Sequence, residues 1–122
     1  MKRGLVVDKS AVIRMIAGRI LGMLRFQSEE VDGQAKALEI CERLMPNVIL
    51  VDGTRPSAQT LDFLRTVRNM PGGRETKIIY CAMENDEMAI GRALRAGADD
   101  VLFKPFDRRS MQEKFEDVGL LS

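Results

Sequence analysis

Four charged side chains of complementary sign follow short apolar segments of the chain. Asp8 and Lys9 follow the first such segment, Asp52 follows another and Lys104 follows a third. If these segments are parallel strands, their carboxyl ends meet at one sheet edge, where open α/β sheets bind ligands. Two carboxylates and two ammonium groups would converge there. Surface ion pairs, which stabilise little, are the alternative, but complementary charges at three strand ends favour a functional cleft.

The absence of histidine and the small number of cysteines limit the kinds of catalytic group available to the chain. The chain has no histidine, which excludes histidine as general base, metal ligand or phosphoryl carrier. A nucleophile must therefore come from Asp, Glu, Ser, Thr, Lys or Cys. The two cysteines, Cys41 and Cys81, are too few and too isolated for a disulfide framework or a C-x-x-C site, and we expect buried free thiols. Asp52 is then the candidate nucleophile.

Composition indicates one soluble globular domain. The chain has 122 residues, 45% of them apolar and 30% charged, with a formal net charge of +1. This charge favours neither nucleic acid nor a membrane as partner. No apolar run approaches the roughly 20 residues that span a bilayer. Residues 1–8 begin like a signal peptide, but their apolar stretch is too short and ends in a charge. We expect a cytoplasmic protein.

Short apolar runs predict strands buried on both faces. The clearest is Val48–Asp52, four apolar residues preceded by Pro46-Asn47 and ending in a carboxylate. The polar segment 26–31 is expected at the sheet edge. Strands are predicted over residues 2–7, 26–31, 48–52, 77–82 and 100–103.

Apolar residues at helical spacing predict a helix after each strand. Gly97 ends the fourth helix and Asp107 caps the fifth. We expect Leu44, at the end of the second helix, and Leu94, in the fourth, to face the core. Five strands that alternate with five helices imply right-handed βαβ units and a doubly wound parallel sheet. Residues 1–122 are thus expected to form a single α/β domain.

In the order and spacing of Asp8, Asp52 and Lys104, the chain resembles the response-regulator receiver domain family in its stand-alone, CheY-like form. The resemblance covers essentially the whole chain. Its carrying segments are Val6-Val7-Asp8, Leu50-Val51-Asp52, Pro56, Ala96-Gly97-Ala98-Asp99 and Phe103-Lys104-Pro105-Phe106. The resemblance implies the flavodoxin-like strand order 2-1-3-4-5. It also implies a non-enzymatic single-domain response regulator of a two-component phosphorelay, of the chemotaxis type or a related one.

The resemblance implies a role for each residue at the sheet edge. Asp52 would accept a phosphoryl group from the phosphohistidine of a histidine kinase or phosphotransfer protein. Lys104 would contact the phosphoryl oxygens, and its bond to Pro105 is usually cis in the family. Asp8, Asp52 and the backbone carbonyl of Thr54 would hold Mg²⁺. A downstream protein would bind the face formed by the fourth helix, fifth strand and fifth helix. Because carboxylates are weak nucleophiles, transfer depends on positioning and on neutralising cations.

The sequence departs from the family pattern at several working positions. Lys9 replaces the second acid after the first strand, Ala82 replaces a phosphoryl-binding Thr or Ser, and Val101 replaces a Tyr or Phe. The loop 55–60 is also altered. These changes indicate an atypical receiver. The alternative function is a phosphorylation-independent pseudo-receiver that acts as a protein-binding module.

Lys9 bears directly on the Mg²⁺ site. An ammonium in place of an acid removes a ligand and adds repulsion, which argues against Mg²⁺ binding. Lys9 could occupy the metal position as a tethered cation beside Asp52, or it could extend into solvent. Two enzyme-like alternatives fit poorly. A D-x-D-G-T phosphatase motif lacks its first acid because residue 50 is Leu50, and no phosphate loop for FMN follows the first strand.

Overall fold

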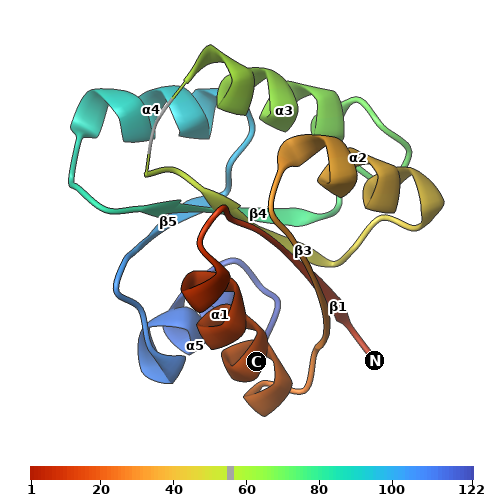
Figure 1. The fold of residues 1–122 in the computed structure, drawn as a ribbon, viewed down its shortest axis with the longest axis vertical. Coiled ribbons are helices and arrows are strands. Elements are labelled where there is room, and N and C mark those ends of the chain that lie inside the picture. The colour runs from red at the N-terminus through yellow and green to blue at the C-terminus, as the bar shows by residue number, and fades with distance from the viewer. Residues whose placement is uncertain (55–56) are drawn as a thin grey trace.

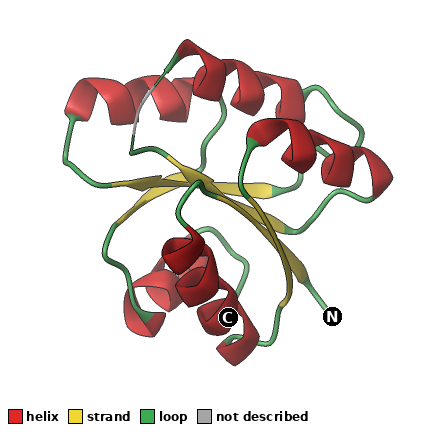
Figure 2. Ribbon diagram, in the orientation of Figure 1, coloured by secondary structure: helices red, strands yellow, loops and turns green. Residues whose placement is uncertain are grey.

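A parallel five-stranded sheet lies at the centre of the molecule, with helices on both faces (Figures 1 and 2). The computed structural model describes residues 1–54 and 57–122, so the predictions on Arg55 and Pro56 lie outside the described residues. The strands, in order β2-β1-β3-β4-β5, are β1 (Arg3–Val7), β2 (Gln27–Val31), β3 (Val48–Asp52), β4 (Lys77–Ala82) and β5 (Asp100–Phe103). Both the doubly wound parallel architecture and the predicted strand order are confirmed.

The helices form two layers. Their bounds are α1 (Ala11–Met23), α2 (Gln34–Arg43), α3 (Ala58–Arg68), α4 (Glu87–Ala96) and α5 (Arg108–Asp117). Figure 1 shows α1 and α5 on one face of the sheet and α2, α3 and α4 on the other. The placement of α1 opposite α2, α3 and α4 is the consequence of right-handed crossovers that change direction after β2. No helix in the described part of the chain is long and apolar enough to cross a membrane.

The core has one half on each side of the sheet, and β3 contributes to both. Ile49 and Val51 pack beneath α2, α3 and α4, whereas Val48 and Leu50 pack beneath α1 and α5. All four are at most 2% exposed. This explains the uninterrupted apolar run in β3, because a central strand covered on both faces has no solvent side. The edge strand β2 is exposed at its first four residues, as its polar sequence predicts.

Two core predictions are wrong. Leu44 is 61% exposed, because α2 ends at Arg43 and Leu44 itself has an extended backbone, so helical spacing no longer sets its direction. Leu94 is 42% exposed. The buried side of α4 is made by small residues at helical spacing, Ala89, Ala93 and Ala96, and Leu94 lies about 100° around the helix from Ala93.

The helix ends are set by local hydrogen bonds. Asp107 accepts a bond from the Ser110 N–H and the Ser110 hydroxyl bonds back to the Asp107 N–H, which together form a capping box. Gly97 ends α4 at a φ of +134°, a conformation that favours glycine. The Lys104–Pro105 peptide bond is cis, as the resemblance implies. Cys41 and Cys81 are buried free thiols, as predicted.

Candidate functional site

The sheet topology brings three strand ends to one edge. Asp8 directly follows β1, Asp52 is the last residue of β3, and Lys104 directly follows β5. In the register of neighbouring strands, Val7 pairs with Val51, so Asp8 and Asp52 leave adjacent strands at the same level. All three side chains line a cleft of about 910 Å³. The structure therefore brings together the acids and the distal lysine that the sequence singles out.

The Lys104 ammonium is hydrogen-bonded to three side chains of this cleft. Its ammonium Nζ lies 2.7 Å from Asp8 Oδ2, 2.9 Å from Asp52 Oδ1 and 3.0 Å from Thr54 Oγ1. The Lys104 and Asp8 side chains are 4% and 5% exposed, whereas Asp52 is 23% exposed. Three oxygen partners match the three donors of an ammonium. The buried charge is thus fully hydrogen-bonded, which offsets the free energy lost on its desolvation.

Backbone N–H groups hold the two carboxylates in place. The Thr54 N–H donates to Asp52 Oδ1 at 2.8 Å, and the Ser10 N–H donates to Asp8 Oδ1 at 2.9 Å. The Arg14 guanidinium donates to the carbonyl oxygens of Asp8 and Lys9, which anchors the β1–α1 turn to the first helix. Each carboxylate is therefore oriented by the turn that follows its own strand, and both aim at Lys104.

This network favours the charged forms of Asp52 and Lys104. Burial by itself would raise the pKa of Asp52, but hydrogen bonds from Thr54 and Lys104 outweigh burial and lower the pKa below its ordinary 3.8. Burial would likewise lower the pKa of Lys104, but its bonds to Asp8 and Asp52 prevail and raise it. Asp52 is consequently a carboxylate, the form that a nucleophile needs.

Lys9 lies at the rim of the same cleft and is exposed. Among residues 1–54 and 57–122, the ion pair of Asp52 is made by Lys104 rather than by Lys9. The described contact of Lys9 is through its backbone carbonyl, which accepts from Arg14 at 3.1 Å. A role for Lys9 as a tethered cation therefore stays a prediction.

Two residues that depart from the family pattern, Ala82 and Val101, lie on β4 and β5. Ala82 is 3% exposed at the end of β4, and Val101 is half-buried in β5. The hydroxyl that contacts Lys104 belongs instead to Thr54. Sequence reasoning missed this side chain because it assigned Thr54 only a backbone carbonyl. The available signal was the placement of a hydroxyl two residues after the candidate nucleophile.

Tyr80 is a second residue that sequence reasoning missed. It is 2% exposed on β4, and its hydroxyl donates to the Gly53 carbonyl at 3.3 Å. A Cβ at Gly53 would lie 2.4 Å from Tyr80 Cζ, so the close approach requires glycine. Burial, together with the charges of Asp52 and Asp86, raises the pKa of Tyr80. The signal in the sequence was the glycine that directly follows Asp52.

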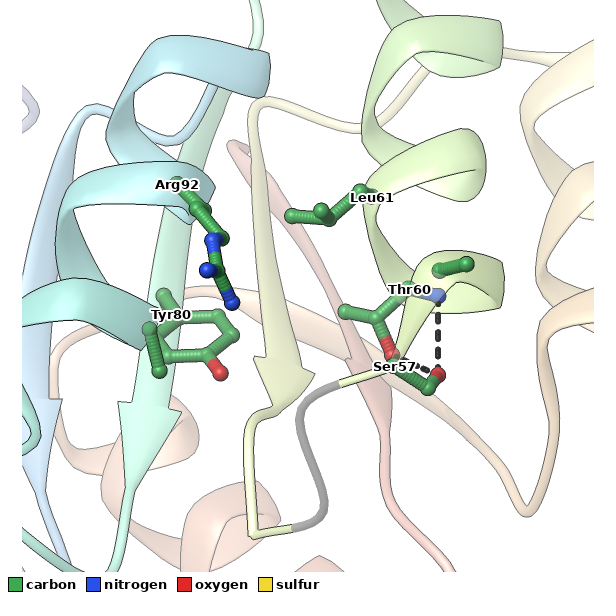
Figure 3. A pocket seen from close by; sticks show the side chains of 7 residues that line it. Ser57, Thr60, Leu61, Tyr80 and Arg92 are labelled. Atoms are coloured by element: carbon green, nitrogen blue, oxygen red, sulfur yellow. Dashed lines mark hydrogen bonds between the residues drawn. The ribbon is translucent and has the colours of Figure 1, made fainter.

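Tyr80 also borders a small pocket between α3 and α4. Figure 3 shows Arg92 of α4 extending toward the Tyr80 ring, with Leu61, Thr60 and Ser57 across from them. The pocket has a volume of about 340 Å³. The hydroxyl of Ser57 caps α3 by accepting from the Thr60 N–H at 3.2 Å. Gly53 is thus held by Tyr80, and Ser57 caps the helix that follows.

The donor set of the cleft fits a modest magnesium site. The described residues contain no group of three or more acidic or cysteine side chains that could hold a metal. Mg²⁺ nevertheless binds to as few as one or two carboxylates, completed by water and phosphate oxygens. Asp8 and Asp52 both reach one ammonium, so they converge closely enough to share a cation. The Lys104 ammonium already pairs with both carboxylates, so an incoming metal ion must compete with it for them.

Comparisons with known proteins agree with this geometry. Residues 5–116 match the family described as response regulator receiver domain. The chain is 33% identical to the rice two-component response regulator ORR6 over 83% of its own length, and spans 61% of that longer protein. It is 29% identical to the chemotaxis protein CheY of Thermotoga maritima, over 97% of this chain and 98% of that one.

A solved structure extends the match to three dimensions. It is the receiver domain of the sensor histidine kinase PA1611 from Pseudomonas aeruginosa, with a magnesium ion coordinated in the active site cleft. The two chains superpose with a TM-score of 0.83 at 25% identity, over 95% of each. The family match over nearly the whole chain, joined to the shared fold, settles the affiliation. This chain belongs to the response regulator receiver domain family.

Proposed function

We propose that this chain is a single-domain response regulator in which Asp52 accepts a phosphoryl group from a phosphohistidine. Receiver domains are signalling modules that interact with histidine kinases or phosphotransfer proteins and with downstream targets. The observation that supports the proposal most is the Asp52 carboxylate, ionised, 23% exposed and 2.9 Å from the Lys104 ammonium. A nucleophile that opens to a cleft and already contacts a cation suits phosphoryl transfer.

The transfer follows from these groups. A carboxylate oxygen of Asp52 attacks the phosphorus atom while the bond from phosphorus to the imidazole nitrogen breaks. The electron pair of that bond returns to the imidazole of the donor protein. Lys104 faces the negative charge that develops on the phosphoryl oxygens, and Asp8 holds its ammonium in place at 2.7 Å. The Thr54 N–H keeps the carboxylate oriented at 2.8 Å.

Mg²⁺, where it binds, would be held by Asp8, Asp52 and the backbone carbonyl of Thr54. It supplies positive charge that neutralises the phosphoryl oxygens during transfer. The magnesium ion in the active site cleft of the Pseudomonas receiver domain supports a metal site in this cleft. Two features of this chain weaken the site. Lys104 is bonded to both carboxylates, and Lys9 places a positive charge at the rim.

Intact-mass spectrometry after treatment with acetyl phosphate tests the proposal. We expect one hydroxylamine-sensitive phosphoryl adduct on the wild-type protein and none on Asp52→Asn, which keeps the side-chain size but removes the nucleophile. Asp62→Asn, an exposed carboxylate on α3, is the matched control and should be modified like the wild type. An adduct that persists in Asp52→Asn, or no adduct on the wild type, contradicts the proposal.

A second function, phosphorylation-independent protein binding, has one observation in its favour. Neither Ala82 nor Val101 can provide the hydroxyl and aromatic group by which the family transmits phosphorylation. The partner surface would be formed by α4, β5 and α5, where Met88 and Phe103 are 68% and 41% exposed. In that case a partner captured by the wild type would bind Asp52→Asn equally well, with or without acetyl phosphate.

A further inference from the structure

The strand that should provide a hydroxyl to the phosphoryl group does not do so. Ala82, the last residue of β4, is 3% exposed and offers only its backbone carbonyl, which accepts from the Lys104 N–H at 2.8 Å. Within residues 1–54 and 57–122, the hydroxyl that contacts the Lys104 ammonium is that of Thr54. It reaches the cleft from the segment that follows β3, the strand next to β4.

We propose that the Thr54 hydroxyl is the phosphoryl-positioning group of this protein and takes over the contact that β4 lacks. The inference rests on the proposed function, because it assigns a partner to the phosphoryl group on Asp52. It differs from the backbone role expected for Thr54, since it concerns the side chain.

The hydrogen-bond directions support this assignment. An ammonium can only donate, so Thr54 Oγ1 accepts from Lys104 Nζ at 3.0 Å. The hydroxyl proton of Thr54 is then left to donate to another oxygen in the cleft. The Asp52 carboxylate is within reach: the Thr54 N–H contacts it at 2.8 Å, and a hydrogen bond from the Thr54 side chain contributes to its lowered pKa. A phosphoryl group on Asp52 would place three strong acceptor oxygens beside this proton.

The position of Thr54 is fixed although its side chain is exposed. The Gly53 N–H donates to the Cys81 carbonyl at 2.7 Å, and the Gly53 carbonyl accepts from the Tyr80 hydroxyl. The residue before Thr54 is therefore tied to β4 through both of its backbone groups. Exposure at the cleft leaves the hydroxyl accessible to a ligand, while the anchored backbone holds it in place before the ligand arrives.

Three variants separate a hydroxyl contact from a structural role. Thr54→Val removes the hydroxyl and retains the shape and the backbone N–H, whereas Thr54→Ser retains the hydroxyl. The double variant Thr54→Val with Ala82→Ser returns a hydroxyl to β4. The probe is beryllofluoride, which forms a phosphoryl-like adduct with a carboxylate, and its affinity is measured by amide NMR titration at saturating Mg²⁺. Thermal unfolding without the probe reports the structural effect.

We expect Thr54→Val to bind beryllofluoride roughly 10- to 100-fold more weakly than the wild type, the effect of one hydrogen bond to a charged group. Thr54→Ser should bind like the wild type, and the double variant should regain most of the loss. Thr54→Val should unfold a few degrees below the wild type, because one donor of the buried Lys104 ammonium loses its acceptor, whereas Thr54→Ser should keep the wild-type unfolding temperature. Wild-type affinity in Thr54→Val, or equal losses in Thr54→Val and Thr54→Ser, overturns the inference alone. A wild-type protein that binds no beryllofluoride overturns the proposed function and this inference together.

Discussion

At the residue scale, Lys9 carries a positive charge beside the two acids that would hold a metal. Asp8 and Asp52 together carry two negative charges, and Lys104 offers one positive charge to both. Lys9 lies at the rim of the same cleft and adds a second positive charge. A divalent cation would therefore enter a site whose carboxylates are already paired with the Lys104 ammonium and whose rim carries the Lys9 charge. We expect these two positive charges to lower the affinity of the site for a divalent cation.

Lys9→Asp should restore metal binding. The substitution removes a positive charge that repels the metal and adds a carboxylate that can bind it. Because residue 9 is partly in contact with solvent, we expect Mg²⁺ affinity to increase by about 10-fold or more. Isothermal titration calorimetry measures the change. Lys9→Gln separates the two effects because it removes the charge without adding a carboxylate, and it should give a smaller gain. Equal Mg²⁺ affinities in wild type and Lys9→Asp would show that residue 9 does not face the metal.

At the scale of elements, the contact between β4 and the loop after β3 sets the shape of the site. Gly53 lies against the Tyr80 ring and is followed directly by Thr54, so any shift of the loop moves the Lys104 contact as well. The ring of Tyr80 also borders the pocket between α3 and α4 that is shown in Figure 3. The Tyr80 ring therefore contacts Gly53 on one side and lines that pocket on another.

Gly53→Ala tests this contact. The new methyl group would lie 2.4 Å from Tyr80 Cζ, so the ring must move, and we expect a loss of about 1–3 kcal/mol in the free energy of unfolding, typical of an overpacked core. Urea denaturation measures it. Gly22→Ala is the control, because nothing lies within 4 Å of its Cβ and alanine favours helices, so it should stabilise the protein. In a Tyr80→Leu background the Gly53→Ala loss should shrink.

Particular residues show what sequence can and cannot predict at this scale. The bounds of β3 and β4 are as predicted, because apolar runs between turn residues have few alternatives. The meeting of Asp8, Asp52 and Lys104 follows from topology alone. The Thr54 hydroxyl and the Tyr80 ring do not, because their directions depend on rotamers that only neighbouring elements select. Leu94 was misplaced for another reason, because the buried face of α4 is formed by Ala89, Ala93 and Ala96 rather than by larger apolar residues.

For the whole molecule, the ion pairs of the cleft link stability to pH. Asp52 has a lower pKa in the folded protein than its ordinary 3.8, so its ionised form stabilises the fold. This contribution is complete above the ordinary pKa and is lost as pH falls through the lower folded value. The contribution of Lys104 to stability depends on pH in the opposite direction. Its pKa is raised above 10.5, so its contribution is present below that value and is lost at higher pH.

We expect the stability difference between wild type and Asp52→Asn to depend on pH accordingly. Asparagine cannot ionise, so the wild type should lose more unfolding free energy than Asp52→Asn when the pH is lowered from 7 into the range below 3.8. Urea denaturation at several pH values measures both curves. Glu113→Gln, whose pair with Arg109 is highly exposed, should follow the wild type. Parallel curves for wild type and Asp52→Asn would contradict the linkage.

The bond from Lys104 to Asp8 spans 96 positions of the chain, and this has a consequence for the order of folding. β1 and β3 are neighbours whose pairing needs only the first half of the sequence. An intermediate in which these strands have paired before β5 arrives brings two acids together with no ammonium between them. Such an intermediate is penalised by like-charge repulsion that is relieved only when the last strand docks. The charge arrangement thus favours cooperative closure of the sheet over a stable N-terminal half.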